Sequence, residues 1–187
     1  MVTNSYYVPG TALTPITLAK AKKQLRLEVD FTEEDDLIQS YIDSALIIAE
    51  NYINRALSPR KFVLEMDRFE NPFQFSQNNI DDTIDKVEYF APGETEASLL
   101  ADTEYKARTS IYIECKEIKF KTTPTTDSRD DAVIITINQG FTSATDIPKP
   151  IVQAMLLIIS DMYERRDDKE IGTNSAANAL MRPYRKY

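Results

Sequence analysis

The sequence predicts an α+β protein, in which helices from the two ends of the chain form a small bundle and a mostly antiparallel β-sheet is inserted between them. Apolar residues recur at three- and four-residue spacing near both ends, which is typical of helices. In the middle they alternate with polar residues, which is typical of half-buried strands. The expected parts of one domain, residues 1–187, are helical segments 14–57 and 147–182, a β-rich insertion at about 60–141, and a C-terminal tail at 182–187.

Two helices are predicted in the N-terminal third. Thr17 precedes a short amphipathic run that ends near Leu25, so its side chain is expected to cap the first helix. The second helix, 33–55, is expected to begin after Thr32, with Thr32 as its cap and the four acids at 33–36 where the helix dipole favours them. These acids could also be taken for a metal-binding carboxylate cluster, but helix capping explains them better.

Strands are predicted in the middle of the chain, where the hydrophobic period falls to two residues. Polar stretches rich in turn-forming residues separate the candidates, which gives about five or six short strands. The candidates are centred on residues 62–66, 87–89, 111–113, 118–120 and 133–137.

The last predicted helix, 151–163, is apolar on almost every side. Pro148 and Pro150 lead into it, and proline is tolerated in the first helical turn. Such a helix must be buried on nearly all sides, so we expect it to pack on the helix at 33–55, with neighbouring subunits completing its burial. The apolar run is too short for a membrane span, which needs about 20 residues. The expected core or interface residues are Ile151, Met155, Ile158, Met162 and Tyr163.

Composition argues against several classes of protein. The chain has no histidine and one cysteine, Cys115, so it lacks the commonest general base and cannot form an internal disulfide or a zinc site of the usual ligand types. Its net charge of −8 is the opposite of what a protein gripping DNA phosphates would carry. The first residues have neither the basic nor the apolar region of a signal peptide.

A Glu-x-Lys pair, which serves metal and water in a common nuclease core, occurs at 104–106, 114–116 and 117–119. The spacing is frequent in any chain rich in acids and lysines, and charged residues on the solvated face of a strand explain it better. We therefore predict no catalytic, cofactor-binding or metal-binding residue. A metal-dependent nuclease remains the less favoured alternative, to be tested with Mg²⁺ or Mn²⁺ and duplex DNA.

Several segments of the chain, taken together in their order and spacing, resemble the small head–tail connector (adaptor) proteins of long-tailed double-stranded DNA phages and prophages. Together they cover about half of the chain. The segments are 16–27 (ITLAKAKKQLRL), 33–38 (EEDDLI) with 49–52 (AENY), 147–166 (IPKPIVQAMLLIISDMYERR) and 180–185 (LMRPYR).

The resemblance implies a structural virion protein without enzyme activity or cofactor. Members of this family form a ring of about a dozen subunits beneath the portal protein, which extends the channel through which DNA passes without sequence-specific binding. The ring joins head to tail by receiving a head-completion (stopper) or tail protein. The expected location is the head–tail junction of the virion, after a period in the host cytoplasm, with no membrane contact.

The C-terminal tail is basic, aromatic and too short to be structured alone, so we expect it to become ordered on binding a partner, the portal protein. An alternative with the same fold is another phage tail-completion or assembly module, which would stay monomeric even with portal present. The candidate docking residues are Arg182, Pro183, Tyr184, Arg185 and Tyr187.

Overall fold

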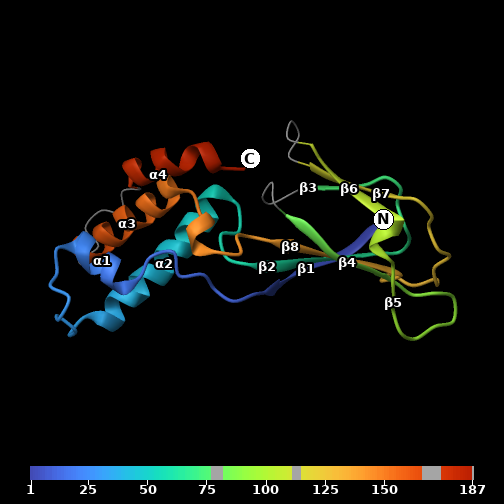
Figure 1. Ribbon diagram of the computed structural model, residues 1–187, viewed down its shortest axis with the longest axis horizontal. Coiled ribbons are helices and arrows are strands. Elements are labelled where there is room, and N and C mark those ends of the chain that lie inside the picture. Colours follow the sequence, from blue (N-terminus) through green and yellow to red (C-terminus); the bar gives the residue numbers. More distant parts are fainter. Residues whose placement is uncertain (77–81, 111–114, 166–173, 187) are drawn as a thin grey trace. The chain divides into compact units, whose positions relative to one another are not determined.

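The computed structural model describes residues 1–76, 82–110, 115–165 and 174–186. The chain divides into two compact units (Figure 1): a β unit made of residues 1–12 and 58–140, and a helical unit made of residues 13–57 and 141–187. The fold is α+β, as the sequence predicts, with the helices of both chain ends in one unit and the strands in the other.

The helical unit is built around one central helix. That helix, α3, packs against three others. The predicted packing of the helix at 151–163 on the helix at 33–55 is confirmed. None of the described helices is both long enough and apolar enough to cross a membrane. The helices are α1 (Leu18–Leu25), α2 (Asp35–Ile53), α3 (Lys149–Glu164) and α4 (Ser175–Met181), with short 3₁₀ turns η2 (Ala144–Asp146) and η3 (Arg182–Tyr184).

The predicted start is correct for α1 and wrong for α2. Thr17 caps α1 as predicted, because its hydroxyl oxygen accepts a hydrogen bond from the Lys20 amide at 3.3 Å. The expected cap at Thr32 is wrong: α2 begins at Asp35, with Glu34 at the N-cap position and no side-chain cap. The acids in the first turn, Asp35 and Asp36, are confirmed. Tertiary contacts of this region, described below, account for the later start.

The core of the helical unit comes mainly from α2 and α3. Apolar residues at helical spacing on α2 face those on α3, and Ala177 and Met181 of α4 close the cluster. Burying such side chains contributes about 1.5–3 kcal/mol each relative to leaving them exposed. The fully buried residues of the two long helices are Ile38, Ile42, Ala45, Ala49 and Ile53 on α2, and Ile151, Ala154, Met155 and Ile159 on α3.

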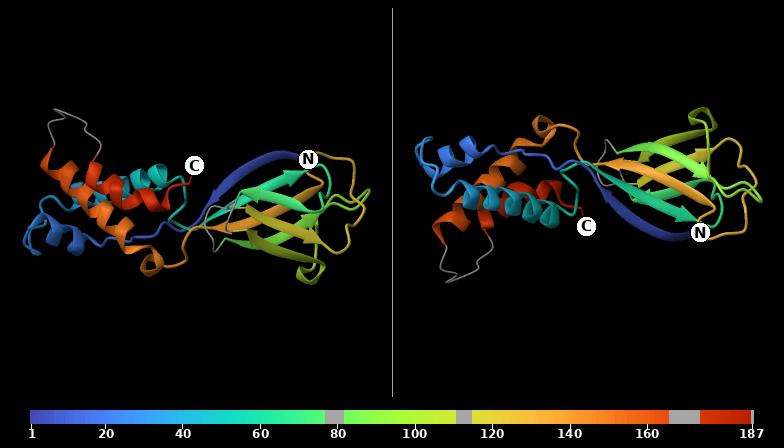
Figure 2. Two further views of the ribbon diagram at one scale, coloured as in Figure 1. Left: turned by 90° about the horizontal axis from the view of Figure 1, so that it is seen from above. Right: turned by 90° about the horizontal axis from the view of Figure 1, so that it is seen from below.

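The β unit contains two antiparallel sheets (Figure 2). The five-stranded sheet has the order β1-β2-β8-β4-β5 and the three-stranded sheet the order β3-β7-β6. A 3₁₀ turn, η1 (Asp102–Glu104), precedes β6. The strands are β1 (Val2–Pro9), β2 (Arg60–Met66), β3 (Phe73–Ser76), β4 (Thr83–Tyr89), β5 (Ser98–Leu99), β6 (Tyr105–Ser110), β7 (Cys115–Phe120) and β8 (Val133–Gln139).

The two sheets pack face to face over one apolar core. Val133, Ile135 and Ile137 of β8 supply the centre of the larger sheet, and they meet Ile118 and Phe120 of β7 from the smaller one. The antiparallel pairing is predicted from the sequence, but the division into two packed sheets is not. The strand candidates at 62–66, 87–89, 118–120 and 133–137 are found, whereas the candidate at 111–113 lies outside the described residues.

Candidate docking surface of the helical unit

The candidate core residues of α3 lie inside the helical unit to different extents. Ile151, Met155 and Ile158 are 1%, 0% and 7% exposed, so α1, α2 and α4 of the same chain already bury them. Met162 and Tyr163 are half-buried and pack against the edge of the same core. The Tyr163 hydroxyl donates a 2.6 Å hydrogen bond to Glu34 Oε2, which attaches the end of α3 to the start of α2.

The C-terminal tail continues from α4 and packs against the end of α2. The Arg55 Nε donates to the Tyr184 carbonyl oxygen at 2.9 Å, and the Lys186 amide donates to the Ile53 carbonyl oxygen at 2.8 Å. The guanidinium of Arg185 lies 5.3 Å from the ring centroid of Tyr52. The expectation that the tail lacks structure until a partner binds is therefore wrong. The last carbonyls of a helix have no partner within the helix, and the tail supplies one.

The tail and the end of α2 bring four basic residues into one region, the C-terminal basic surface: Arg55, Arg182, Arg185 and Lys186. The Glu50 carboxylate at the same end of α2 accepts a 2.7 Å hydrogen bond from the Leu57 amide. Arg182 and Arg185 are exposed, while Arg55 and Lys186 are half-buried. Cations at this position also stabilise the negative end of the α2 dipole. Arginine forks bind carboxylates in two-pronged geometry, so this surface can bind an acidic protein segment.

The docking residues named from the sequence fall around this surface. Pro183 is exposed and Tyr184 is half-buried in η3, whereas Tyr187 lies outside the described residues. Sequence reasoning missed Arg55, because it lies about 130 positions from the tail and nothing in its local pattern connects the two.

The acidic start of α2 makes structural contacts. The Lys22 ammonium lies 2.6 Å from Asp35 Oδ1 and donates to the Val29 carbonyl oxygen at 3.3 Å. With the bond from Tyr163 to Glu34, these contacts occupy two of the four clustered acids. Lys22 is nearly fully buried, so the pair fixes the loop between α1 and α2.

The Glu-x-Lys candidates lie on the β unit among ordinary polar contacts. Glu104 Oε2 accepts a hydrogen bond from the Thr122 hydroxyl at 2.8 Å, and Glu117 Oε2 accepts one from the Gln74 amide at 3.0 Å. Glu114 lies outside the described residues. Across the ranges that the structure describes, no three or more His, Cys, Asp or Glu side chains are grouped so that they could hold a metal ion.

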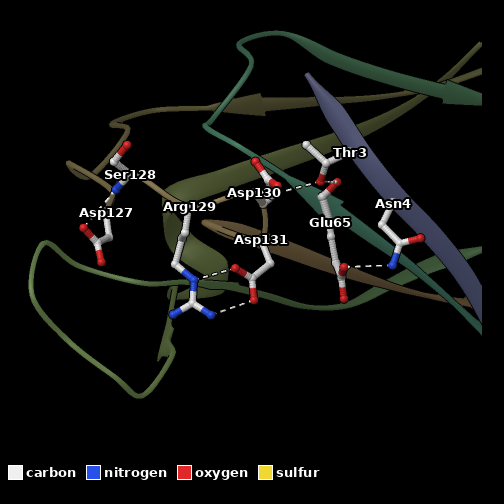
Figure 3. A network of polar contacts seen from close by, with 8 residues as sticks. All are labelled: Thr3, Asn4, Glu65, Asp127, Ser128, Arg129, Asp130 and Asp131. Carbon is white, nitrogen blue, oxygen red and sulfur yellow. Dashed lines mark hydrogen bonds and ion pairs between the residues drawn. The ribbon is translucent and has the colours of Figure 1, made fainter.

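A polar network joins β1 to the loop before β8 (Figure 3). The Thr3 hydroxyl donates to the Asp130 carbonyl oxygen at 2.6 Å, and the Asn4 amide donates to Glu65 Oε2 at 3.0 Å. Arg129 donates to Asp131 Oδ2 at 2.8 Å and holds the pKa of that carboxyl below its usual value. The bonds of Thr3 and Asn4 attach the N-terminal strand to the rest of the β unit.

A comparison with known protein families identifies the family of this chain. The family model for phage gp6-like head–tail connector proteins matches residues 15–119, which is more than half of the 187 residues. The chain belongs to this family. The resemblance inferred from the sequence is thereby confirmed, and the match covers the whole of α1 and α2 and most of the strands.

Solved structures share the connector fold over nearly the whole chain. A chain from the neck of an empty gene transfer agent (GTA) particle, computed with C6 symmetry, has a TM-score of 0.72 at 20% identity, with 97% of this chain and 96% of that chain covered. A chain of the native GTA virion gives 0.70 at 20% identity, covering 97% and 95%. A chain of the native GTA neck, computed with C12 symmetry, gives 0.67 at 18% identity, covering 97% and 96%. No curated protein matches the sequence.

Proposed function

We propose that this chain is a connector subunit that assembles into a ring of about a dozen copies beneath the portal, extends the DNA channel and joins the head of a phage-like particle to its tail. The observation that carries the proposal is the family match over residues 15–119. Likeness to neck chains from particles with C12 and C6 symmetry supports a ring. In this proposal residues 1–187 act as one connector domain without enzyme activity, located at the head–tail junction after synthesis in the host cytoplasm.

The net negative charge of the chain supports a role as the wall of a channel for DNA. A ring of copies that each carry a net charge of −8 repels phosphates overall, so DNA passes without being held. A strongly basic wall would bind the phosphates and slow their passage. The connector therefore needs no sequence-specific contact with DNA, and its partners are proteins: portal on one side and a stopper or tail protein on the other.

The C-terminal basic surface is the proposed site of portal docking. Its exposed residues, Arg182 and Arg185, lie on a segment whose backbone is held by the contacts of Tyr184 with Arg55 and of Lys186 with Ile53. A surface that is already ordered loses less conformational entropy on binding than a disordered tail would. The complementary surface on the portal protein is expected to carry carboxylates.

Substitution tests this docking better than deletion of the tail does, because deletion would also remove the Lys186 amide that binds the end of α2. Arg182→Glu is expected to weaken portal binding by at least about tenfold, through repulsion at a charged interface. The matched control is Lys23→Glu, an exposed cation on α1. If portal affinity falls equally in both variants, or in neither, the C-terminal basic surface is not the docking site.

A further inference from the structure

The N-terminal strand β1 presents an unusual surface. All eight of its residues are exposed, and it lies at one edge of the five-stranded sheet, where it pairs with β2 alone among the described strands (Figure 2). Five of the nine large hydrophobic residues that are exposed in the described chain belong to this end. They are Met1, Val2, Tyr6, Tyr7 and Val8.

No side chain of the same segment is charged; the N-terminal ammonium pairs with Asp67 and Glu70, and the Arg60 guanidinium lies 4.0 Å from the Tyr7 ring centroid. The first charged side chain of the sequence is Lys20, in a protein of which 28% of the residues are charged. Copies that each carry a net charge of −8 repel one another, so they can associate closely only where the contacting surfaces are neutral or complementary. Residues 1–19 are the longest stretch of the chain without a charged side chain, which favours a second copy as the occupant of this surface.

The backbone of β1 is protected against pairing with a further strand. Its side chains are exposed and can contact another protein. Natural edge strands are blunted by proline, bulges or charge. Here the Ser5 amide donates to the Asn4 side-chain oxygen at 2.9 Å, Pro9 has no N–H, and the pairing register shifts between Val2 and Asn4. Contact through β1 therefore involves its side chains, chiefly Tyr6, Tyr7 and Val8, which are 43%, 53% and 42% exposed.

The opposite edge of the same sheet, formed by β5, offers an exposed apolar side chain that β1 of another copy can contact. β5 has only two residues, and Leu99 is 66% exposed there. Opposite edges of one sheet face away from each other, and a closed ring of identical subunits needs two different surfaces that meet head to tail. The β1 edge and the β5 edge meet that requirement within a single unit.

We propose that the exposed side chains of β1 in one copy pack against the Leu99 edge of the next copy, so that the sheet edges form the contact between subunits. The proposal rests on the ring of the proposed function and specifies which surfaces close it. Contact between β1 and β1 of two copies would instead give a two-fold dimer, and it could not propagate around a ring.

Chemical cross-linking tests this arrangement. Cysteines are placed beside the apolar side chains, as Ser5→Cys and Ser98→Cys, in a Cys115→Ser background, and the protein, mixed with a cysteine-free portal protein, is treated with a short bis-maleimide. Within one chain these positions are four strand spacings apart, about 19 Å, which the reagent cannot span. The expected product is a ladder of covalent multimers, which falls by at least about tenfold when Leu99→Lys is added. Each single-cysteine variant can give nothing larger than a dimer.

Either of two results overturns the proposal: a ladder that is absent, or one that persists unchanged with Leu99→Lys. Electron microscopy of the unmodified protein mixed with portal protein distinguishes this failure from failure of the proposed function. Rings without a ladder would show that the subunits form a ring through surfaces other than the sheet edges. If neither rings nor a ladder form, both proposals fall.

Discussion

The ammonium nitrogen of Lys22 lies 2.6 Å from Oδ1 of Asp35, and 4% of the Lys22 side chain is exposed, compared with 28% of the Asp35 side chain. This buried ion pair joins α1 to the start of α2, and the Val29 carbonyl oxygen is a second acceptor for the same ammonium. Because the cation is the more buried partner, losing the anion should cost more than losing the cation.

Asp35→Ala should therefore destabilise the helical unit by about 2–4 kcal/mol, since it leaves a buried ammonium with one neutral acceptor. Lys22→Met keeps the side-chain volume and leaves a carboxylate that is 28% exposed although its Oδ1 is buried, so its cost should be smaller, about 1–2 kcal/mol. Asp36→Ala, an exposed acid in the same helical turn, is the matched control and should cost about 0.5 kcal/mol. Urea unfolding measures all three, and equal costs for Asp35→Ala and Asp36→Ala would contradict the buried-pair account.

Tyr105 should make the β unit sensitive to high pH. Burial, and then the 2.9 Å hydrogen bond that its hydroxyl donates to Asp102, raise the pKa of Tyr105 from 10.0 to about 12. The unfolded chain loses this proton first, so the contribution is complete below pH 10 and is lost as the pH rises to about 12. The loss should be about 2–3 kcal/mol. Tyr105→Phe should unfold with a flatter pH dependence in this range, and an unchanged profile would refute the assignment.

Asp85 should act in the opposite pH direction. The Lys61 ammonium at 2.8 Å, together with the Asn138 amide, holds the pKa of the Asp85 carboxyl below its ordinary value of 3.8. The stabilisation is present above that ordinary value and is lost as the pH falls through the lower folded pKa. Because both side chains are partly exposed, the contribution should be below about 1 kcal/mol. Thermal melting between pH 5 and 2 (roughly the range over which aspartates titrate) should be less pH-dependent for Asp85→Asn, and a steeper profile would be contrary to expectation.

Gly140 should tolerate no side chain. Its φ is +86°, and a Cβ there would lie 2.1 Å from the Ser58 carbonyl oxygen. Gly140→Ala should cost about 3 kcal/mol or more, from backbone strain and steric overlap together. Gly93 has a φ of +80° with nothing within 4 Å of the added atom, so Gly93→Ala should cost only about 1 kcal/mol. A similar loss of stability in the two variants would show that the close approach to Ser58 is unimportant.

Periodicity in the sequence was sufficient to locate the long helices. α2 and α3 bury the apolar residues whose spacing predicts them, because a helix of four or more turns repeats its pattern often enough to be recognised. The start of α2 could not be placed by the same means. Thr32 has the chemistry of a cap, but the buried contact between Lys22 and Asp35 fixes where the helix begins, and this contact is tertiary.

The edge strand β1 was not predicted, for a related physical reason. Both faces of the strand are exposed, so its residues do not alternate between apolar and polar, and its partner β2 lies more than fifty residues along the chain. The position of the tail was also missed. Its contacts with Arg55 and Ile53 join segments about 130 residues apart, which local sequence patterns do not reveal.

The formation of a ring on the portal can be measured from the mass of the assembled complex. Portal protein and an excess of the 21.4 kDa chain are mixed, and the complex is weighed by native mass spectrometry. About twelve copies are expected to add to each portal ring in one cooperative step. A chain that stays monomeric beside an unchanged portal ring would refute ring assembly and indicate a tail-completion or assembly module instead.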